Sequence, residues 1–135
     1  MTFLALCLSS PVFAEDCSRY EPAVTTVSGV ISIKEYFGPP NYGENPDTDS
    51  KEKFYFIALD KPLCVNASSE YDSAENNINS MEMVYAPSDY PFNNAWLGKR
   101  VSVSGTLFHA QTAHHHTPVL ITVTETHILK AALRH

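Results

Sequence analysis

The sequence has little positive charge, and it has no long apolar run after its first residues. Nine Lys and Arg residues stand against 15 Asp and Glu residues, for a formal net charge of -6 at pH 7. A chain with this balance repels phosphate backbones, so nucleic acid is not an expected partner. No segment reaches the roughly 20 consecutive apolar residues of a membrane-spanning helix. We therefore expect no membrane span.

Recognisable catalytic motifs are also missing. Ser28 and Ser104 each precede a glycine, but neither stands within the G-x-S-x-G pattern that exposes a catalytic serine. The sequence contains no glycine-rich phosphate loop and no pair of carboxylates that stands out as an acid and a base. We therefore do not expect an enzyme. A hydrolase with a site that matches no known motif remains an alternative hypothesis.

The N-terminal segment has the character of a signal peptide. Residues 1–14 carry no charge, are mostly apolar and end in Val12-Phe13-Ala14, two small residues around a large one. This pattern predicts a signal peptide at 1–14, followed by a single β domain at 15–135. The predicted location is the periplasm or the outside of the cell.

Cysteine is scarce, and its positions favour one disulfide. Of the three cysteines, Cys7 lies within the predicted signal peptide, which leaves Cys17 and Cys64 in the mature chain. In an exported protein an even pair indicates a bridge. This bridge would tie the N-terminus to the middle of the chain and contribute about 3–4 kcal/mol in the loop-entropy model.

Apolar and polar residues alternate along much of the chain, as in half-buried β-strands. The pattern predicts strands at 23–36, 53–59, 63–65, 81–86, 100–107 and 119–124, a short helix within 90–98, and a polar surface excursion at 68–80. This order is typical of a small five- to six-stranded Greek-key barrel of the oligonucleotide/oligosaccharide-binding (OB) type with one short helix. A β-sandwich is the alternative.

The last two predicted strands should form a hairpin. Pairing Val103 with Val119 keeps the valines of both strands on one face. Continued outward, this register sets Leu107 opposite His115 and leaves a loop at 109–113. His115 would then be the buried imidazole, whose loss should destabilise the fold more than the loss of a neighbouring histidine.

Two groups of residues are candidates for binding. His109, His114 and His116 could converge at the hairpin tip as ligands of Zn or Cu, because imidazole is a common donor to these metals. The alternative is that these imidazoles are solvated or bonded to the protein itself. The second group lies in or beside residues 37–51, a stretch rich in Gly, Pro, Asn and Asp that predicts a long exposed loop. The predicted ligand-binding residues are Tyr36, Phe37, Asn41, Tyr42, His109 and Thr117.

The sequence resembles an uncharacterised family of small exported bacterial proteins, a domain of unknown function. The resemblance rests on YEP at 20–22, GPPNY at 38–42, ALDKPLCV at 58–65 and, above all, GTLFHAQTAHHHTPVL at 105–120. It implies export and a shared fold, and it supplies no catalytic residues. In the family pattern the position of Gln111 is commonly His, so this chain has one imidazole fewer, which weakens a metal role.

Three functions are therefore compared. The first is a non-enzymatic binding module for a protein, glycan or small ligand of the cell envelope, of which an inhibitor or immunity-type protein is a particular form. The second is a His-rich transition-metal-binding protein, and the third is the hydrolase.

Overall fold

The computed structural model describes residues 16–70 and 73–130. The predicted signal peptide at 1–14 lies outside the described residues. Within the described ranges, we find no helix with the length and apolar character needed to cross a membrane.

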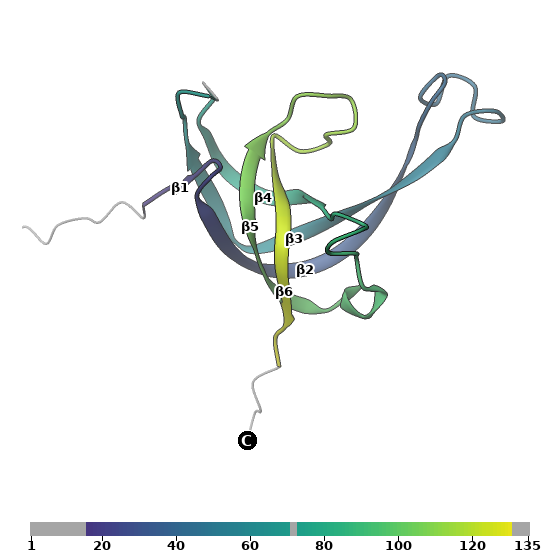
Figure 1. Ribbon diagram of the computed structural model, residues 1–135. Coiled ribbons are helices and arrows are strands. Elements are labelled where there is room, and N and C mark those ends of the chain that lie inside the picture. Colours follow the sequence, from purple (N-terminus) through teal and green to yellow (C-terminus); the bar gives the residue numbers. More distant parts are fainter. Residues whose placement is uncertain (1–15, 71–72, 131–135) are drawn as a thin grey trace, which may run out of the picture.

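A single mixed sheet of six strands forms the body of the protein (Figure 1). The strands are β1 (Ser18–Arg19), β2 (Val24–Phe37), β3 (Lys51–Asn66), β4 (Glu75–Val84), β5 (Arg100–His109) and β6 (Val119–Ile128), with a 3-10 turn, η1 (Asn94–Trp96), before β5. Five of them pair in a closed ring in the order β3-β2-β5-β6-β4, because β4 also pairs with β3. The short β1 adds to the edge of β3 in parallel.

The predicted mostly β fold with one short helical turn is confirmed. Neighbours in the ring are antiparallel except for β4 and β6, which pair in parallel. One sheet that closes on itself, rather than two facing sheets, is the OB-like arrangement that the strand order predicts, and it differs from the β-sandwich alternative.

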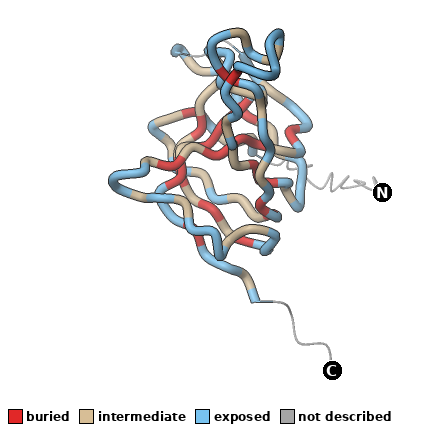
Figure 2. Tube along the Cα trace, turned by 90° about the vertical axis from the view of Figure 1, so that its right-hand side faces the viewer, coloured by how far each residue is buried: buried red, intermediate tan, exposed pale blue. Residues whose placement is uncertain are grey.

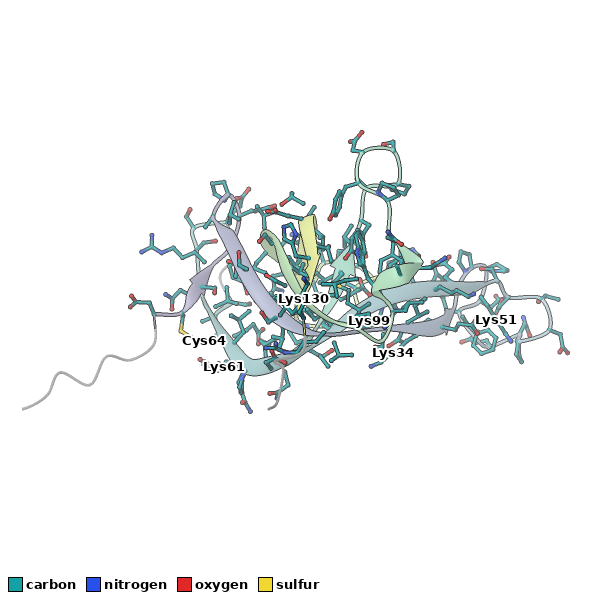
Figure 3. The ribbon with its side chains drawn as sticks, turned by 90° about the horizontal axis from the view of Figure 1, so that it is seen from below. Lys34, Lys51, Lys61, Cys64, Lys99 and Lys130 are labelled. Atoms are coloured by element: carbon teal, nitrogen blue, oxygen red, sulfur yellow. A yellow bond between two sulfur atoms is a disulfide. The ribbon has the colours of Figure 1, made fainter. Side chains whose placement is uncertain are left out.

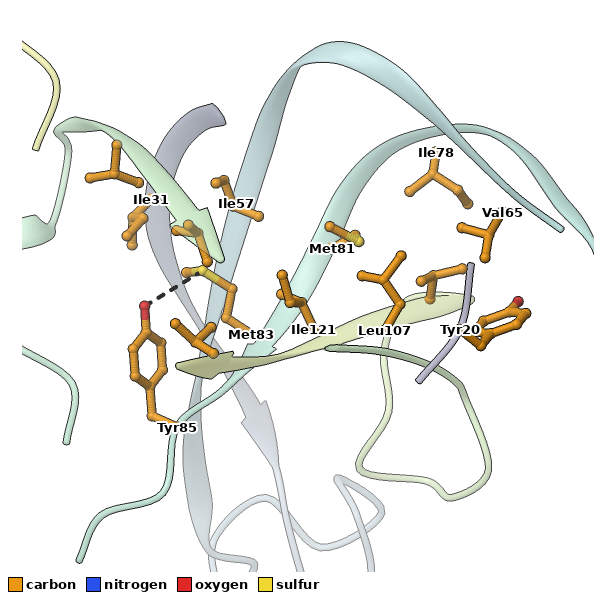
Figure 4. Close-up of a cluster of buried hydrophobic side chains, with 14 residues drawn as sticks. Tyr20, Ile31, Ile57, Val65, Ile78, Met81, Met83, Tyr85, Leu107 and Ile121 are labelled. Carbon is orange, nitrogen blue, oxygen red and sulfur yellow. Dashed lines mark hydrogen bonds between the residues drawn. The ribbon is translucent and has the colours of Figure 1, made fainter. Parts of the chain in front are cut away.

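The core fills the inside of the ring with the alternate residues of each strand (Figure 4). Ile31, Ile57 and Met81 lie opposite one another across β2, β3 and β4, and each is at most 1% exposed. At one end Tyr85 donates to the sulfur of Met83, and its removal from water raises its pKa to about 12. Buried stretches lie along the strands, whereas the connecting loops are exposed (Figure 2).

The strand boundaries differ from the predicted ones most clearly in β3 and β4. β3 runs without a break through Pro62 and joins the two strands that were predicted at 53–59 and 63–65. Between Ala58 and Val65 the strand shifts its register against β4 instead of ending. β4 begins at Glu75, inside the expected surface excursion. The polar residues of 75–80 can form a strand because most of their side chains are exposed. Ile78 is the residue of this stretch that reaches the core.

The predicted register of the last hairpin is wrong. Leu107 lies opposite Ile121, not His115, and Val103 lies opposite Thr126. Alternation determines which face each residue takes, but shifts by two, four or six residues preserve that face, so it leaves the offset open. A bulge at Gly105 adds a further shift, and a Cβ there would lie 1.9 Å from the Thr122 carbonyl oxygen.

The predicted disulfide between Cys17 and Cys64 is confirmed, with an S–S distance of 2.06 Å. It joins the start of the described chain to β3, beside the two residue pairs that hold β1 against that strand. Further along, the Glu21 backbone N–H donates to the Leu107 carbonyl at 2.8 Å. The N-terminal segment is thereby held against the ring at two places.

Candidate functional site

The connection between β5 and β6, residues 110–118, is here called the His loop. It folds back over the outer face of β3, β4 and β6 instead of extending the hairpin. The hydroxyl of Thr117 accepts from the Glu82 backbone N–H at 3.0 Å and donates to the Val119 carbonyl at 2.7 Å. On the same outer face, Phe56 is 2% exposed and Leu120 is fully buried, although neither belongs to the core inside the ring. A second, smaller apolar cluster therefore lies on this outer face.

A buried contact between His116 and Glu82 holds the His loop to the strands. The Nδ1 atom of His116 contacts the Glu82 carboxylate, and the side chains are only 15% and 3% exposed. The imidazole stacks on Tyr36, with ring centroids 3.8 Å apart, and touches Phe54 at 4.5 Å. His116 is thus fixed between a carboxylate of β4 and aromatic rings of β2 and β3.

His115 is half-buried in the His loop and lies in no strand, so the expectation that it faces the interior of the ring is wrong. Its Nδ1 atom accepts from the backbone N–H groups of Gln111 at 2.9 Å and Thr112 at 3.3 Å. Because Nδ1 is an acceptor, the proton of the neutral ring is on Nε2. His115 therefore organises its own loop and keeps an N–H donor at Nε2.

His114 connects the His loop to the hairpin of β2 and β3. Its Nδ1 atom lies 3.4 Å from the Glu52 carboxylate, and its ring is 6.1 Å from that of Tyr42. Tyr42 belongs to the first loop, residues 38–50, which projects from the ring at the end of β2 and β3 (Figure 1). Of the predicted binding residues, Tyr36, Tyr42 and Thr117 therefore meet around the His loop.

The predicted metal ligands do not converge. His109 lies at the end of β5 and contacts Glu75 at 2.8 Å through Nε2, while His114 and His116 contact the carboxylates of Glu52 and Glu82. Throughout residues 16–70 and 73–130, no group of three or more His, Cys, Asp or Glu side chains is placed to hold a metal ion. The Zn or Cu site therefore remains a prediction, and in this geometry the three imidazoles do not form a ligand set.

The first loop is organised by the carboxylate of Asp49. Its oxygens accept from the backbone N–H groups of Asn41 at 2.9 Å, Gly43 at 2.8 Å and Asn45 at 3.1 Å. Partial removal from water raises the pKa of Asp49, but these donors outweigh it and hold the pKa below the ordinary value of 3.8. Asn41 thus bonds to Asp49 through both its backbone and its side chain, and Phe37 and Tyr42 are exposed beside it.

Asp49→Asn should release the first loop while the ring stays folded. An amide group offers one acceptor oxygen where the carboxylate has two, so at least one of the three N–H donors loses its partner. We expect faster hydrogen exchange at the amides of Asn41, Gly43 and Asn45, measured by NMR, with little change in melting temperature.

The pH dependence of the same exchange follows from the lowered pKa. The stabilisation is fully present above the ordinary pKa of 3.8 and is lost as the pH falls through the lower folded value. Asp47→Asn, an exposed neighbour, is the matched control. Equal exchange rates in both variants would contradict the role of Asp49.

A groove of about 440 Å³ lies beside the His loop, against β3, β4 and the residues that follow β4. The chain that follows β4, which carries Pro87, Pro91 and Phe92, forms its opposite wall. Phe92 stacks on Tyr55, with ring centroids 3.8 Å apart, and this contact fixes the wall to β3. We call this hollow the β3–β4 groove. Phe54, Tyr55, Val84 and Phe92 give it a largely apolar surface, and Lys53, His114 and His115 bring polar groups.

Sequence reasoning missed Glu82, Lys53 and Phe92, which stand at the centre of this region. For Glu82 a signal was available, because one acidic residue between Met81 and Met83 in a buried strand requires a partner. The partner His116 is 34 residues away, so only the folded chain identifies it. For Lys53 and Phe92 we find no signal in the local sequence.

A protein-family model matches the part of the chain that contains the His loop. Residues 80–127 match the model of DUF4431, a domain of unknown function. The matched segment contains the second half of β4, all of β5, the His loop and nearly all of β6. No curated protein matches the chain significantly. No solved structure does so either.

Proposed function

We propose that this protein is a non-enzymatic binding module whose ligand occupies the β3–β4 groove. The observation that carries the proposal is the position of the groove against β3, β4 and the His loop. In OB-type folds the second and third strands and the loop between the last two strands form the binding face. In this chain those elements are β3, β4 and the His loop.

The dimensions and lining of the groove support the same proposal. Its volume of about 440 Å³ lies within the range of small-molecule sites, roughly 300–1,000 Å³. Such sites combine apolar walls with a few fixed polar groups. Here the walls are held by the Tyr55–Phe92 stack, and the His loop is held by the His116–Glu82 pair. A site fixed in this way loses little conformational freedom when a ligand binds.

Binding is favoured over catalysis because the imidazoles of the His loop are engaged with the protein itself. His116 is buried against Glu82, and Nδ1 of His115 accepts from two backbone N–H groups. These bonds position the loop and do not activate a neighbouring nucleophile. The Cys17–Cys64 disulfide supports export to the periplasm or beyond, since such bonds persist in oxidising compartments.

A fragment screen followed by two-dimensional amide NMR tests the proposed site. Ligands should shift the amide signals of Phe54, Val84 and Phe92, with smaller effects elsewhere. Val84→Glu places a charge on the outward side of β4 within the groove and should abolish these shifts.

Val30→Glu is the matched control, because Val30 is 41% exposed and does not line the groove. It should leave fragment binding unchanged. No binder at all, or binders whose shifts persist in Val84→Glu, would overturn the proposed site.

A further inference from the structure

The charge of the β3–β4 groove is opposite to that of the chain as a whole. Two charged side chains border it, Lys53 and Glu82. Glu82 is only 3% exposed and is paired with His116, so it presents almost no surface to a ligand. Lys53 is exposed on β3, and among the described residues no carboxylate lies within ion-pair distance of it. The accessible charge of the groove is therefore positive, in a protein of net charge -6.

The two histidines of the groove add hydrogen-bond donors to this positive charge. The Nε2 atom of His115 carries the proton, because Nδ1 accepts from Gln111 and Thr112. His114 is turned by its Nδ1 contact toward Glu52, so that carboxylate is directed at an imidazole. The lining of the groove therefore includes an ammonium group and an imidazole that carries an N–H, and the carboxylate of Glu82 is the only acidic group among the described residues that line it.

The remaining surface is apolar and aromatic. Phe54 and Val84 come from the strands, and Phe92 comes from the opposite wall. An apolar body buried among such side chains gains free energy in proportion to the area that it removes from water. A ligand that fits the groove therefore combines an apolar body with an acceptor group of negative charge.

We infer that the β3–β4 groove binds a small apolar monocarboxylate, with the carboxylate at Lys53 and the apolar body against Phe54 and Phe92. The N–H at Nε2 of His115 is the second donor to the carboxylate. This inference rests on the proposed binding function of the groove, and it adds the chemical class of the ligand.

Three probes with the same apolar body and different head groups test the ligand class. Isothermal titration calorimetry with 5-phenylpentanoate should give measurable binding. We expect 5-phenylpentanol to bind at least about ten-fold more weakly, because a hydrogen bond to a charged group contributes more than one to a neutral group. 5-Phenylpentylamine should bind more weakly still, since its ammonium group would face Lys53.

Lys53→Gln tests the residue. It should weaken 5-phenylpentanoate binding about ten-fold and leave 5-phenylpentanol binding unchanged. Lys61→Gln is the matched control, because Lys61 is also an exposed lysine of β3. Lys53 is close to Lys51 at the start of β3, and Lys61 lies far from Lys51 along the strand (Figure 3). Circular dichroism should show the same melting temperature for both variants.

The outcomes separate the ligand class from the proposed function. Equal binding of the acid and the alcohol, or an unchanged acid affinity in Lys53→Gln, would overturn the carboxylate inference while the groove stays a binding site. The same holds if the acid fails to bind although other fragments shift the groove amides. If no probe and no fragment binds, both the inference and the proposed function are wrong.

Discussion

His116→Ala is expected to lower the free energy of unfolding by about 3 kcal/mol, because it leaves the buried carboxylate of Glu82 without its partner. The variant also removes the stack on Tyr36 and the contact with Phe54, which cover the outer apolar cluster. Urea denaturation followed by circular dichroism measures the loss.

His114→Ala is the matched control for this prediction. The side chains of His114 and Glu52 are 48% and 34% exposed, so their pair should contribute less than about 1 kcal/mol. A double variant, His116→Leu with Glu82→Met, removes both polar partners and should recover much of the stability lost in His116→Ala. Equal losses in His114→Ala and His116→Ala would show that the Glu82 pair does not hold the loop.

Removal of the disulfide is expected to lower the free energy of unfolding by about 3–4 kcal/mol in the loop-entropy model. The bridge closes a chain segment with a sequence separation of 47, so its loss frees a large unfolded loop. The effect should extend to β1, which pairs with β3 through only two residue pairs and depends on the bridge for its position.

The double variant Cys17→Ala with Cys64→Ala measures this effect without a reductant. Its urea midpoint should match that of the reduced wild-type protein and should not respond to dithiothreitol. The prediction is wrong if thiol labelling shows full reduction of the wild type while its midpoint stays where it was.

Loss of the disulfide and loss of the His116–Glu82 pair should affect ligand binding differently. The disulfide holds the N-terminal segment against β3, away from the β3–β4 groove, so its loss should leave groove affinity intact wherever the protein remains folded. The His116–Glu82 pair positions the His loop, whose His114 and His115 line the groove. Loss of that pair should therefore weaken binding as well as stability. Measuring both quantities in both variants separates the scaffold from the site.

The alternation of apolar and polar residues was enough to predict which face of each strand is buried. Val101, Val103 and Leu107 alternate with polar residues, and all three are fully buried inside the ring. Alternation reports this directly, because successive side chains of a strand point to opposite faces. The two cysteines of the expected mature chain were enough to predict the bridge, since each had one possible partner there.

The register of the last hairpin and the partners of the histidines depend on the folded chain and could not be predicted from this alternation. The length of the His loop displaces the hairpin without changing which face each residue takes, so the apolar pattern carries no trace of it. The bulge at Gly105 interrupts the alternation, so that Thr126 is buried and Glu125 is exposed. His116 meets Glu82 across 34 residues and stacks on Tyr36 of a third strand. Such contacts depend on how the ring closes. Local periodicity encodes the face of a side chain, whereas its partner is set by which distant strands the fold brings together.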